Sequence, residues 1–401
     1  MVKYSDIKEV SAQQQKAFIQ DESLSRELLP MLPVDNDSHA LVISGIRRCG
    51  KSTLMRQHIG QDTDKAFYLN FDTPKLFRFD MKDFELLDLL IEETGKQKLY
   101  FDEIQVVEGW ELYIRQKLDQ GFKVCITGSN ASLLSKELGT KLTGRHISKE
   151  LFPFSYKEYC RFHSLPPCAG SFMDYLRDGG FPEFVRTHNQ DILTALFDDI
   201  LYRDIAVRHG VRDVISLKAL LLYLAANLGN LASANKMAGI VGIKTGKTAL
   251  EYLSYFEEAY LIGRMPKFSW SLKAQYVNPQ KIYFIDSALS QAITVSFAEN
   301  AGHFLENVVY WELRRHYQQL YYFSENNSEC DFVVCEKNAP VRLIQVCLEL
   351  HRENETREVE GLREAMRFFK MNTGIIITLD QTDKIRVDEG WIDVIPAYQF
   401  M

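Results

Sequence analysis

Residues 45–52 read Gly-Ile-Arg-Arg-Cys-Gly-Lys-Ser. An apolar run, 40–44, precedes this octapeptide, and a helix-prone stretch, 53–57, follows it. The order strand, G-x-x-x-x-G-K-S, helix is typical of a phosphate-binding loop. Glycines let the backbone curl so that successive N–H groups face one anion, and the helix N-terminus adds partial positive charge. We therefore expect a nucleotide site here; the alternative is a plain turn that matches the pattern by chance.

The residue types inside the loop suit the parts of a nucleotide. Lys51 can reach the β- and γ-phosphates, and the Ser52 hydroxyl can bind Mg²⁺. The nucleotide-binding residues that we expect are Gly45, Arg48, Cys49, Gly50, Lys51, Ser52 and Thr53. The loop therefore predicts a nucleoside triphosphate and Mg²⁺ as ligands.

Composition limits the classes of protein to which the chain can belong. A chain of 401 residues is too long for one core, so two or three domains are expected. The net charge of −7 argues against indiscriminate coating of nucleic acid, although a local basic patch is allowed. The seven cysteines show neither zinc-site nor disulfide spacing, which suits a reducing cytoplasm. Without a signal-type N-terminus or an 18-residue apolar run, we expect a cytoplasmic protein with no membrane partner.

Residues 1–150 are interpreted as one nucleotide-binding domain, because short apolar stretches alternate there with helix-prone ones. We expect strands at 40–44, 65–71, 98–103, 123–127 and 146–148, and helices at 10–29, 84–93, 110–118 and 131–138. Such alternation predicts a parallel sheet with helices on both faces. Ligands of such sheets bind at the carboxyl ends of the strands, where the motifs fall.

Asp102 and Glu103 end one of these apolar strands, about 50 residues after the loop. Asp102 is placed to hold Mg²⁺, and Glu103 can polarise the water that attacks the γ-phosphate. The alternative is an ordinary charged strand end. The order and spacing of the loop and the acidic pair favour the catalytic interpretation.

Two further polar groups are catalytic candidates. Asn130 follows the strand 123–127 and could position the water, although Asn130 or Ser129 could also cap a helix. Arg145 could reach a γ-phosphate in its own or a neighbouring subunit, or could be a surface residue. The catalytic residues that we predict are therefore Glu103, Asn130 and Arg145.

Together these motifs resemble those of one prokaryotic group of the AAA superfamily. The resemblance is carried by G-x-R-R-x-G-K-S-T (45–53), F-D-E-I-Q (101–105), T-G-S-N (127–130) and G-R (144–145) before L-F-P-F-S-Y-x-E-Y (151–159). It covers essentially the whole chain. It implies an ATPase domain fused to a C-terminal region long labelled as a domain of unknown function. It also implies ATP rather than GTP, a sensor-type role for Asn130 or Ser129, and an arginine finger at Arg145.

The middle of the chain is expected to be helical. Residues 151–212 form a connector in which Ser155 and Glu158 match a capping box. Residues 213–290 have the rhythm of a winged helix, with helices at 217–227, 233–241 and 245–258 and wing strands at 259–264 and 276–283. Lys244, Lys247 and Thr248 are the candidates for DNA contact. Because the segment is only mildly basic, a lid or protein-contact role is the alternative.

Residues 300–401 are predicted to alternate as αβββαβ, which resembles the restriction-endonuclease-like P-D-(D/E)-x-K fold. Aligned by order, Glu306, Asp331 and Gln345 match the acidic positions, and Cys347 matches the lysine. Cleavage in that fold needs carboxylates on a divalent metal and a cation that stabilises developing charge. A neutral cysteine cannot supply that cation, although Lys337 or Arg342 could substitute. We therefore expect a degenerate domain used for binding or assembly, with active nuclease as the alternative.

The predicted fold class is α/β: a P-loop NTPase parallel sheet, then a helical and winged-helix region, then a restriction-endonuclease-like domain. The leading function is a Mg²⁺-dependent ATPase that couples its nucleotide state to the later modules. The alternatives are a nucleotide-gated DNA-binding or assembly module with little turnover, and a metal-dependent DNA endonuclease. An arginine finger acting between subunits would require a homo-oligomer.

Overall fold

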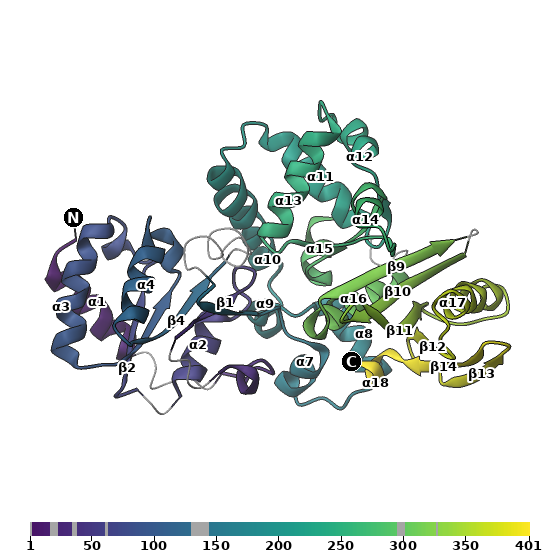
Figure 1. Cartoon of the computed structure of the whole chain (residues 1–401), viewed down its shortest axis with the longest axis horizontal. Helices are drawn as coiled ribbons and strands as arrows, with labels where there is room; N and C mark the ends of the chain where they lie inside the picture. Colours follow the sequence, from purple (N-terminus) through teal and green to yellow (C-terminus); the bar gives the residue numbers. More distant parts are fainter. Residues whose placement is uncertain are drawn as a thin grey trace. The chain divides into compact units, whose positions relative to one another are not determined.

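The computed structural model describes residues 2–16, 23–33, 38–60, 63–129, 144–294, 301–325 and 328–401. The chain divides into two compact units, 1–152 and 153–401. Figure 1 colours the first unit purple to blue and the second from blue-green to yellow. The boundary lies two residues from the predicted end of the nucleotide-binding domain. The finer division into 151–212, 213–290 and 300–401 stays a prediction.

The N-terminal unit is built on a five-stranded parallel sheet. Its strands are β1 (Ala40–Ser44), β2 (Ala66–Asn70), β3 (Lys98–Asp102), β4 (Lys123–Gly128) and β5 (His146–Glu150). Across the sheet their order is β2-β3-β4-β1-β5, so the carboxyl ends of β1, β4 and β3 are neighbours. The predicted parallel sheet is confirmed, and the loop and the acidic pair leave it at the same edge.

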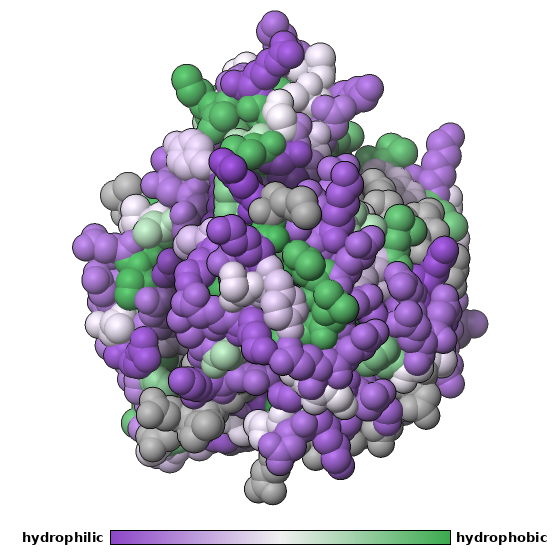
Figure 2. Space-filling model, turned by 90° about the vertical axis from the view of Figure 1, so that its left-hand side faces the viewer, coloured by the Kyte–Doolittle hydropathy of each residue, from purple (hydrophilic) through white to green (hydrophobic). Residues whose placement is uncertain are grey.

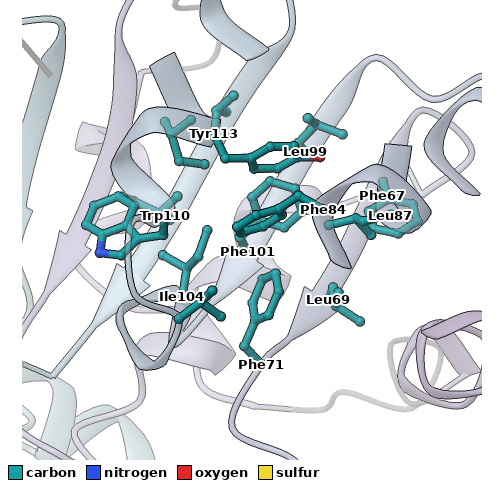
Figure 3. Close-up of a cluster of buried hydrophobic side chains, with 14 of the residues drawn as sticks. Phe67, Leu69, Phe71, Phe84, Leu87, Leu99, Phe101, Ile104, Trp110 and Tyr113 are labelled. Carbon is teal, nitrogen blue, oxygen red and sulfur yellow. The ribbon is translucent and has the colours of Figure 1, made fainter. Parts of the chain in front are cut away.

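Helices cover the sheet because its strands are apolar on both faces. One face packs against α1 (Tyr4–Lys16), α3 (Phe84–Thr94) and α4 (Trp110–Asp119), and α2 (Lys51–Ile59) packs on β1 and β4. Figure 3 shows the aromatic centre of the first layer. There Phe84 of α3 stacks on Tyr113 of α4, with ring centroids 3.9 Å apart, above Phe101 of β3. This rigid layer holds the strand ends that carry the site.

The expected helix over residues 10–29 is wrong in its bounds. The helix α1 begins at Tyr4 and extends to Lys16, and residues 23–28 are not helical. Pro30 and Pro33 cannot continue a helix, and Arg26 instead directs its buried side chain at the phosphate loop. A tertiary contact therefore overrides the local helix propensity of this segment.

The face of the molecule drawn in Figure 2 is covered mostly by hydrophilic residues. Hydrophobic residues lie between them in small groups. Scattered apolar side chains are ordinary on a protein surface, because polar atoms alone cannot cover it. The large apolar side chains of the N-terminal unit are instead concentrated in the core described above.

The second unit begins with helices, as predicted for the connector. They are α7 (Tyr156–His163), α8 (Ala169–Asp178), α9 (Pro182–Thr187), α10 (Gln190–Asp198) and a π-helix, η6 (Asp199–Val207). The capping box before α7 is confirmed: Ser155 accepts the Glu158 N–H, and the Glu158 carboxylate accepts the Ser155 N–H.

The next segment alternates helices with three short strands. In order they are α11 (Val214–Ala226), β6 (Leu231–Ala232), α12 (Ala234–Val241), α13 (Gly246–Glu258), β7 (Ile262–Met265), α14 (Leu272–Val277), β8 (Gln280–Phe284) and α15 (Ser287–Ile293). The three strands form a small sheet in the order β6-β8-β7. The predicted strand 276–283 is wrong in its first half, because Ser271 caps α14 by accepting the Ala274 N–H. The winged-helix interpretation itself stays a prediction.

The C-terminal part follows the expected αβββαβ order. It comprises α16 (Ala301–His316), β9 (Gln319–Glu325), β10 (Ser328–Glu336), β11 (Ala339–Val346), α17 (Glu355–Phe369), β12 (Thr373–Thr378), β13 (Asp383–Val387), β14 (Gly390–Pro396) and α18 (Ala397–Phe400). Its strands form one mixed sheet in the order β13-β14-β12-β11-β10-β9. The nuclease-like interpretation of this order remains a prediction.

At Gly361, α17 lies close against the sheet. A Cβ atom at Gly361 would collide with the backbone carbonyl of Glu329, whereas a Cβ at Gly239 of α12 meets open space. We therefore expect Gly361→Ala to lower the free energy of unfolding by about 2 kcal/mol through overpacking. The matched variant Gly239→Ala should raise it by about 0.5–1 kcal/mol, because alanine favours helix. Denaturant unfolding of both variants checks this, and equal effects would contradict the close approach.

Candidate active site at the strand ends

The phosphate loop has the backbone that its glycines predict. Gly45 has φ +153° and Gly50 has φ +102°, and Arg48 between them also has a positive φ of 63°. A Cβ on Gly45 would collide with the Leu151 carbonyl, so only glycine fits there. Gly50 caps α2, whose first residue is Lys51. The loop thus curls over a helix N-terminus, the arrangement that binds phosphate.

Lys51 lies buried at the centre of this loop. Its ammonium donates hydrogen bonds to the Gly45 and Ile46 carbonyls, both at 3.1 Å. It also lies 3.6 Å from the Glu103 carboxylate. The structure therefore brings the loop lysine and the predicted catalytic acid into one site. These contacts keep the ammonium within the loop.

Asp102 is held by neighbours that the parallel register supplies. Tyr68 donates to its Oδ2 at 2.8 Å, the Asn70 amide donates to the same oxygen at 3.0 Å, and Thr127 donates to Oδ1. The Ser52 hydroxyl also lies close enough to this carboxyl to lower its pKa. Burial raises the pKa of Asp102 above its ordinary value, and hydrogen bonds of this kind oppose the rise.

The Ser52–Asp102 pair fits a Mg²⁺ ion. Both groups offer hard oxygen ligands, and the Ser52 hydroxyl lies near enough to Asp102 to influence the pKa of its carboxyl. Within the described ranges no three histidine, cysteine or acidic side chains are placed to form an all-protein metal cage. Mg²⁺ needs none, because it usually takes one or two protein oxygens together with phosphates and water.

Glu103 stands in an unusual backbone conformation. Its φ of 53° places it in the left-handed region, which is uncommon for glutamate and occurs often at functional sites. Its N–H donates to the Thr127 hydroxyl at 3.0 Å, and the Gln105 amide donates to its carboxylate. These contacts turn the side chain away from the strand and toward Lys51.

Arg26 supports the phosphate loop through hydrogen bonds. Its buried guanidinium donates to the Cys49 carbonyl and to the Phe152 carbonyl, each at 2.7 Å. The Cys49 thiol donates to the Leu151 carbonyl at 3.3 Å, and burial raises the pKa of that thiol. Cys49 is therefore a neutral packing residue of the loop rather than a nucleophile.

The remaining predicted residues are less central. Thr53 lies in the first turn of α2, where its hydroxyl accepts a hydrogen bond from Arg56. Asn130 lies outside the described residues; Ser129, just before it, is buried. Arg145 precedes β5 at the amino edge of the sheet, where it pairs with Asp119 at 2.5 Å. The structure does not bring Arg145 to the loop of its own chain, so a finger role would have to be in a neighbouring subunit.

Sequence reasoning missed Arg26, Tyr68 and Asn70 and gave Thr127, inside the T-G-S-N motif, no separate role. Asn70 and Thr127 each stand near the carboxyl end of an apolar strand, and Asn70 is in register with Asp102. That position was a usable signal, because polar side chains at neighbouring strand ends converge. Nothing local marked Arg26, which reaches the loop only through the fold.

A second cluster of charges lies in the C-terminal unit. The predicted acids Glu306 and Asp331 do converge, and they surround the ammonium of Lys281 from β8, at 3.0 and 2.7 Å. Gln345 lies beside them and accepts the Asp331 N–H at 3.1 Å. Burial alone would lower the pKa of Lys281, but the two carboxylates raise it well above its usual range. Burial also raises the pKa of Glu306 to about 7, which Lys281 opposes.

Neither of the two basic residues that we considered as substitutes reaches this cluster. Lys337 lies exposed in the turn between β10 and β11, and Arg342 is exposed with its guanidinium 5.7 Å from the Tyr317 ring. Cys347 stays a neutral thiol, because burial raises its pKa to about 12. The signal for Lys281 was a lysine inside the strand Lys-Ile-Tyr-Phe, on the same face as Tyr283.

The parallel sheet, the glycine loop at β1 and the acidic end of β3 define an ATPase-like module of the P-loop class. The family model described as an AAA domain matches residues 37–160. Two models described as domains of unknown function, DUF8612 and DUF4143, match residues 169–300 and 301–400.

Two curated relatives match nearly the whole chain. Uncharacterized protein MJ1544 of Methanocaldococcus jannaschii is 33% identical over 390 residues, which are 90% of this chain and 87% of the relative. An uncharacterized protein of Haemophilus influenzae is 30% identical over 397 residues, which are 93% and 96% of the two chains. The chain belongs to the family of these proteins, in which an AAA domain precedes two domains of unknown function.

Solved structures show more distant likeness. Cdc6p of Pyrobaculum aerophilum covers 69% of this chain and 96% of its own, with 15% identity and a TM-score of 0.29. PCH-2 of C. elegans covers 62% and 68%, with 13% identity and a TM-score of 0.25. These scores add nothing to the assignment. In the part of the chain that the structure describes, no helix has the length and apolar character needed to cross a bilayer.

Proposed function

We propose that the N-terminal unit binds MgATP and hydrolyses it, and that the loop passes its nucleotide state to the rest of the chain. One observation supports this proposal above all. The Lys51–Glu103 pair and the Ser52–Asp102 pair lie together at one edge of the sheet. A solvated charged strand end would not need the buried hydrogen-bond network around Asp102. In a P-loop ATPase, groups of these types hold the phosphates and Mg²⁺ and activate the attacking water.

The proposed division of labour follows from the contacts. The loop N–H groups and Lys51 would hold the phosphates, and Ser52 and Asp102 would hold Mg²⁺. Bound there, Mg²⁺ would neutralise charge on the phosphate oxygens. Glu103 would accept the proton of the attacking water, because Gln105 and the Thr127 contact hold it in place. Asn130 and, from a neighbouring subunit, Arg145 remain proposed contributors at the γ-phosphate.

The path from the loop to the later modules runs through the end of the first unit. Gly45 abuts the Leu151 carbonyl, the Cys49 thiol bonds to the same carbonyl, and Arg26 joins Cys49 to Phe152. Residue 153 begins the second unit. A loop that shifts on binding nucleotide therefore moves the residues at which the chain leaves the ATPase unit. This is how we propose that nucleotide state reaches the winged-helix-like and nuclease-like regions.

DNA binding is the second candidate function, and the exposed residues of the segment 213–290 help to judge it. Lys244 and Lys247 are exposed around the start of α13, as that role needs, and Thr248 is half-buried. However, the segment 213–290 also exposes large apolar side chains, among them Ile240, Leu250, Trp270, Leu272, Tyr276 and Val277. Exposed aromatic and aliphatic side chains suit a protein contact better than contact with a phosphate backbone. We therefore propose that this region contacts protein.

The test of the proposed function is Glu103→Gln, which keeps the shape of the side chain and removes its basicity. We expect MgATP turnover to fall at least about 100-fold while ATP stays bound, since binding does not require the base. Phosphate release and retained nucleotide are measured beside Glu92→Gln, an exposed glutamate of α3. Parent-like turnover in Glu103→Gln would refute the assigned base. Parent protein that binds ATP without turnover would favour a nucleotide-gated module.

A further inference from the structure

The charge cluster of the C-terminal unit holds a cation that belongs to the chain itself. The Lys281 ammonium contacts Glu306, Asp331 and Glu329, the last at 2.7 Å. Three carboxylates take up its three N–H groups. The Lys281 side chain is only 4% exposed, so the ammonium has left water for these contacts. A buried ammonium is tolerated only with such partners.

Two of the carboxylates that contact Lys281 also accept hydrogen bonds from other donors. Glu306 Oε1 also accepts from the Tyr283 hydroxyl at 2.7 Å, and Asp331 Oδ2 accepts from the Val346 N–H at 3.0 Å. The other Glu306 oxygen lies against Gly229, where a Cβ would approach it to 2.9 Å. The two acids are therefore held rigidly around one position, which the nitrogen of Lys281 occupies.

That position is the one a divalent cation would need. A metal bound to both acids must lie between Glu306 and Asp331 at about 2.0–2.6 Å from their oxygens. Lys281 stands between the same oxygens, and two cations cannot share the position because of their repulsion. A cavity of about 1020 Å³ reaches both acids, so access alone would not exclude a metal.

We propose that Lys281 is a built-in substitute for a metal ion, and that its ammonium closes the carboxylate site of the C-terminal domain to divalent cations. The same contact fastens β8, the middle strand of the β6-β8-β7 sheet, to α16 and β10. The acids are thereby retained for a structural reason, without metal-dependent cleavage. The inference does not depend on the ATPase site.

Divalent-cation binding tests the proposal directly. Mn²⁺ is titrated into nucleotide-free protein and followed by calorimetry and by its paramagnetic signal. We expect the full-length parent and its Asp331→Asn variant to bind the same number of Mn²⁺ ions. We expect Lys281→Ala to gain one Mn²⁺ site, bound at least about tenfold more tightly than any in the parent, and Lys281→Ala/Asp331→Asn to lose it. A parent Mn²⁺ site that depends on Asp331 would overturn the proposal, as would no gain in folded Lys281→Ala.

A stability measurement decides the case in which Lys281→Ala does not fold. Lys281→Met should lower the melting temperature, because it leaves three buried or half-buried carboxylates without their cation. Adding Glu306→Gln to Lys281→Met should raise it again, since one uncompensated charge is removed. Lys384→Met, at a 58% exposed lysine paired with Asp393 at 3.0 Å, serves as the control and should leave the melting temperature unchanged. A Lys281→Met variant as stable as Lys384→Met would overturn the fastening role.

Discussion

Replacing Lys51 by alanine is expected to abolish MgATP turnover, with a loss of at least about 100-fold. The buried ammonium of Lys51 is held in the loop by the Gly45 and Ile46 carbonyls and lies beside Glu103. Preorganised charge of this kind accounts for much of the acceleration of phosphoryl transfer. ATP affinity should fall as well, because the variant lacks the buried lysine whose charge would attract the phosphates. Phosphate release and nucleotide binding are measured together.

The control for Lys51→Ala is Lys82→Ala, at an exposed lysine of the same unit. Thermal unfolding of both variants shows whether a lost activity reflects a lost fold. Some destabilisation of Lys51→Ala is expected, because Glu103 loses its cation. If folded Lys51→Ala hydrolysed ATP as fast as the parent, the proposed function of the N-terminal unit would be wrong.

Arg26→Ala is the second large effect that we expect, and it acts at a distance from the phosphates. The change leaves the Cys49 and Phe152 carbonyls without their shared donor, in a place that water does not reach. Hydrogen bonds to a charged group contribute about 1.5–3 kcal/mol each. We therefore expect a loss of about 3–5 kcal/mol in the free energy of unfolding, measured by denaturant titration.

The same variant should weaken ATP binding, because the loop loses its brace. Arg26→Lys is expected to be intermediate, since one ammonium cannot reproduce the two-pronged guanidinium contact. Arg78→Ala, at an exposed arginine of the same unit, should change neither property. An Arg26→Ala protein with parent-like stability and ATP affinity would show that the loop needs no support from the N-terminal segment.

Much of the nucleotide site could be predicted from local pattern. The loop 45–52 carries its own backbone requirements, and the strand that ends at Asp102 carries an apolar period and an acidic end. Parallel strands align their carboxyl ends, so these two motifs had to meet once the sheet was inferred. The predicted capping box at Ser155 was local for the same reason and is confirmed.

Contacts between distant segments could not be predicted in this way. Arg26 lies 23 residues before Cys49 and 126 before Phe152, in a segment whose composition favoured a helix. Arg145 was predicted to reach a γ-phosphate in its own or a neighbouring subunit, or to be a surface residue. The parallel register of β5 with β1 places it at the edge of the sheet opposite the loop. A sequence pattern states spacing along the chain and leaves open which segments pack together.

Features that the sequence determines differ clearly from contacts that only the fold determines, and the C-terminal domain gives the clearest example. The sequence by itself determined the loop with its acidic partner and the αβββαβ order, because each depends on residues close together or on periodicity. Only the tertiary structure decided that Lys281, from a strand of another sheet, stands between Glu306 and Asp331. The reason is physical: burying those carboxylates requires a cation, and the chain could supply it from any segment that the fold brings within about 3 Å.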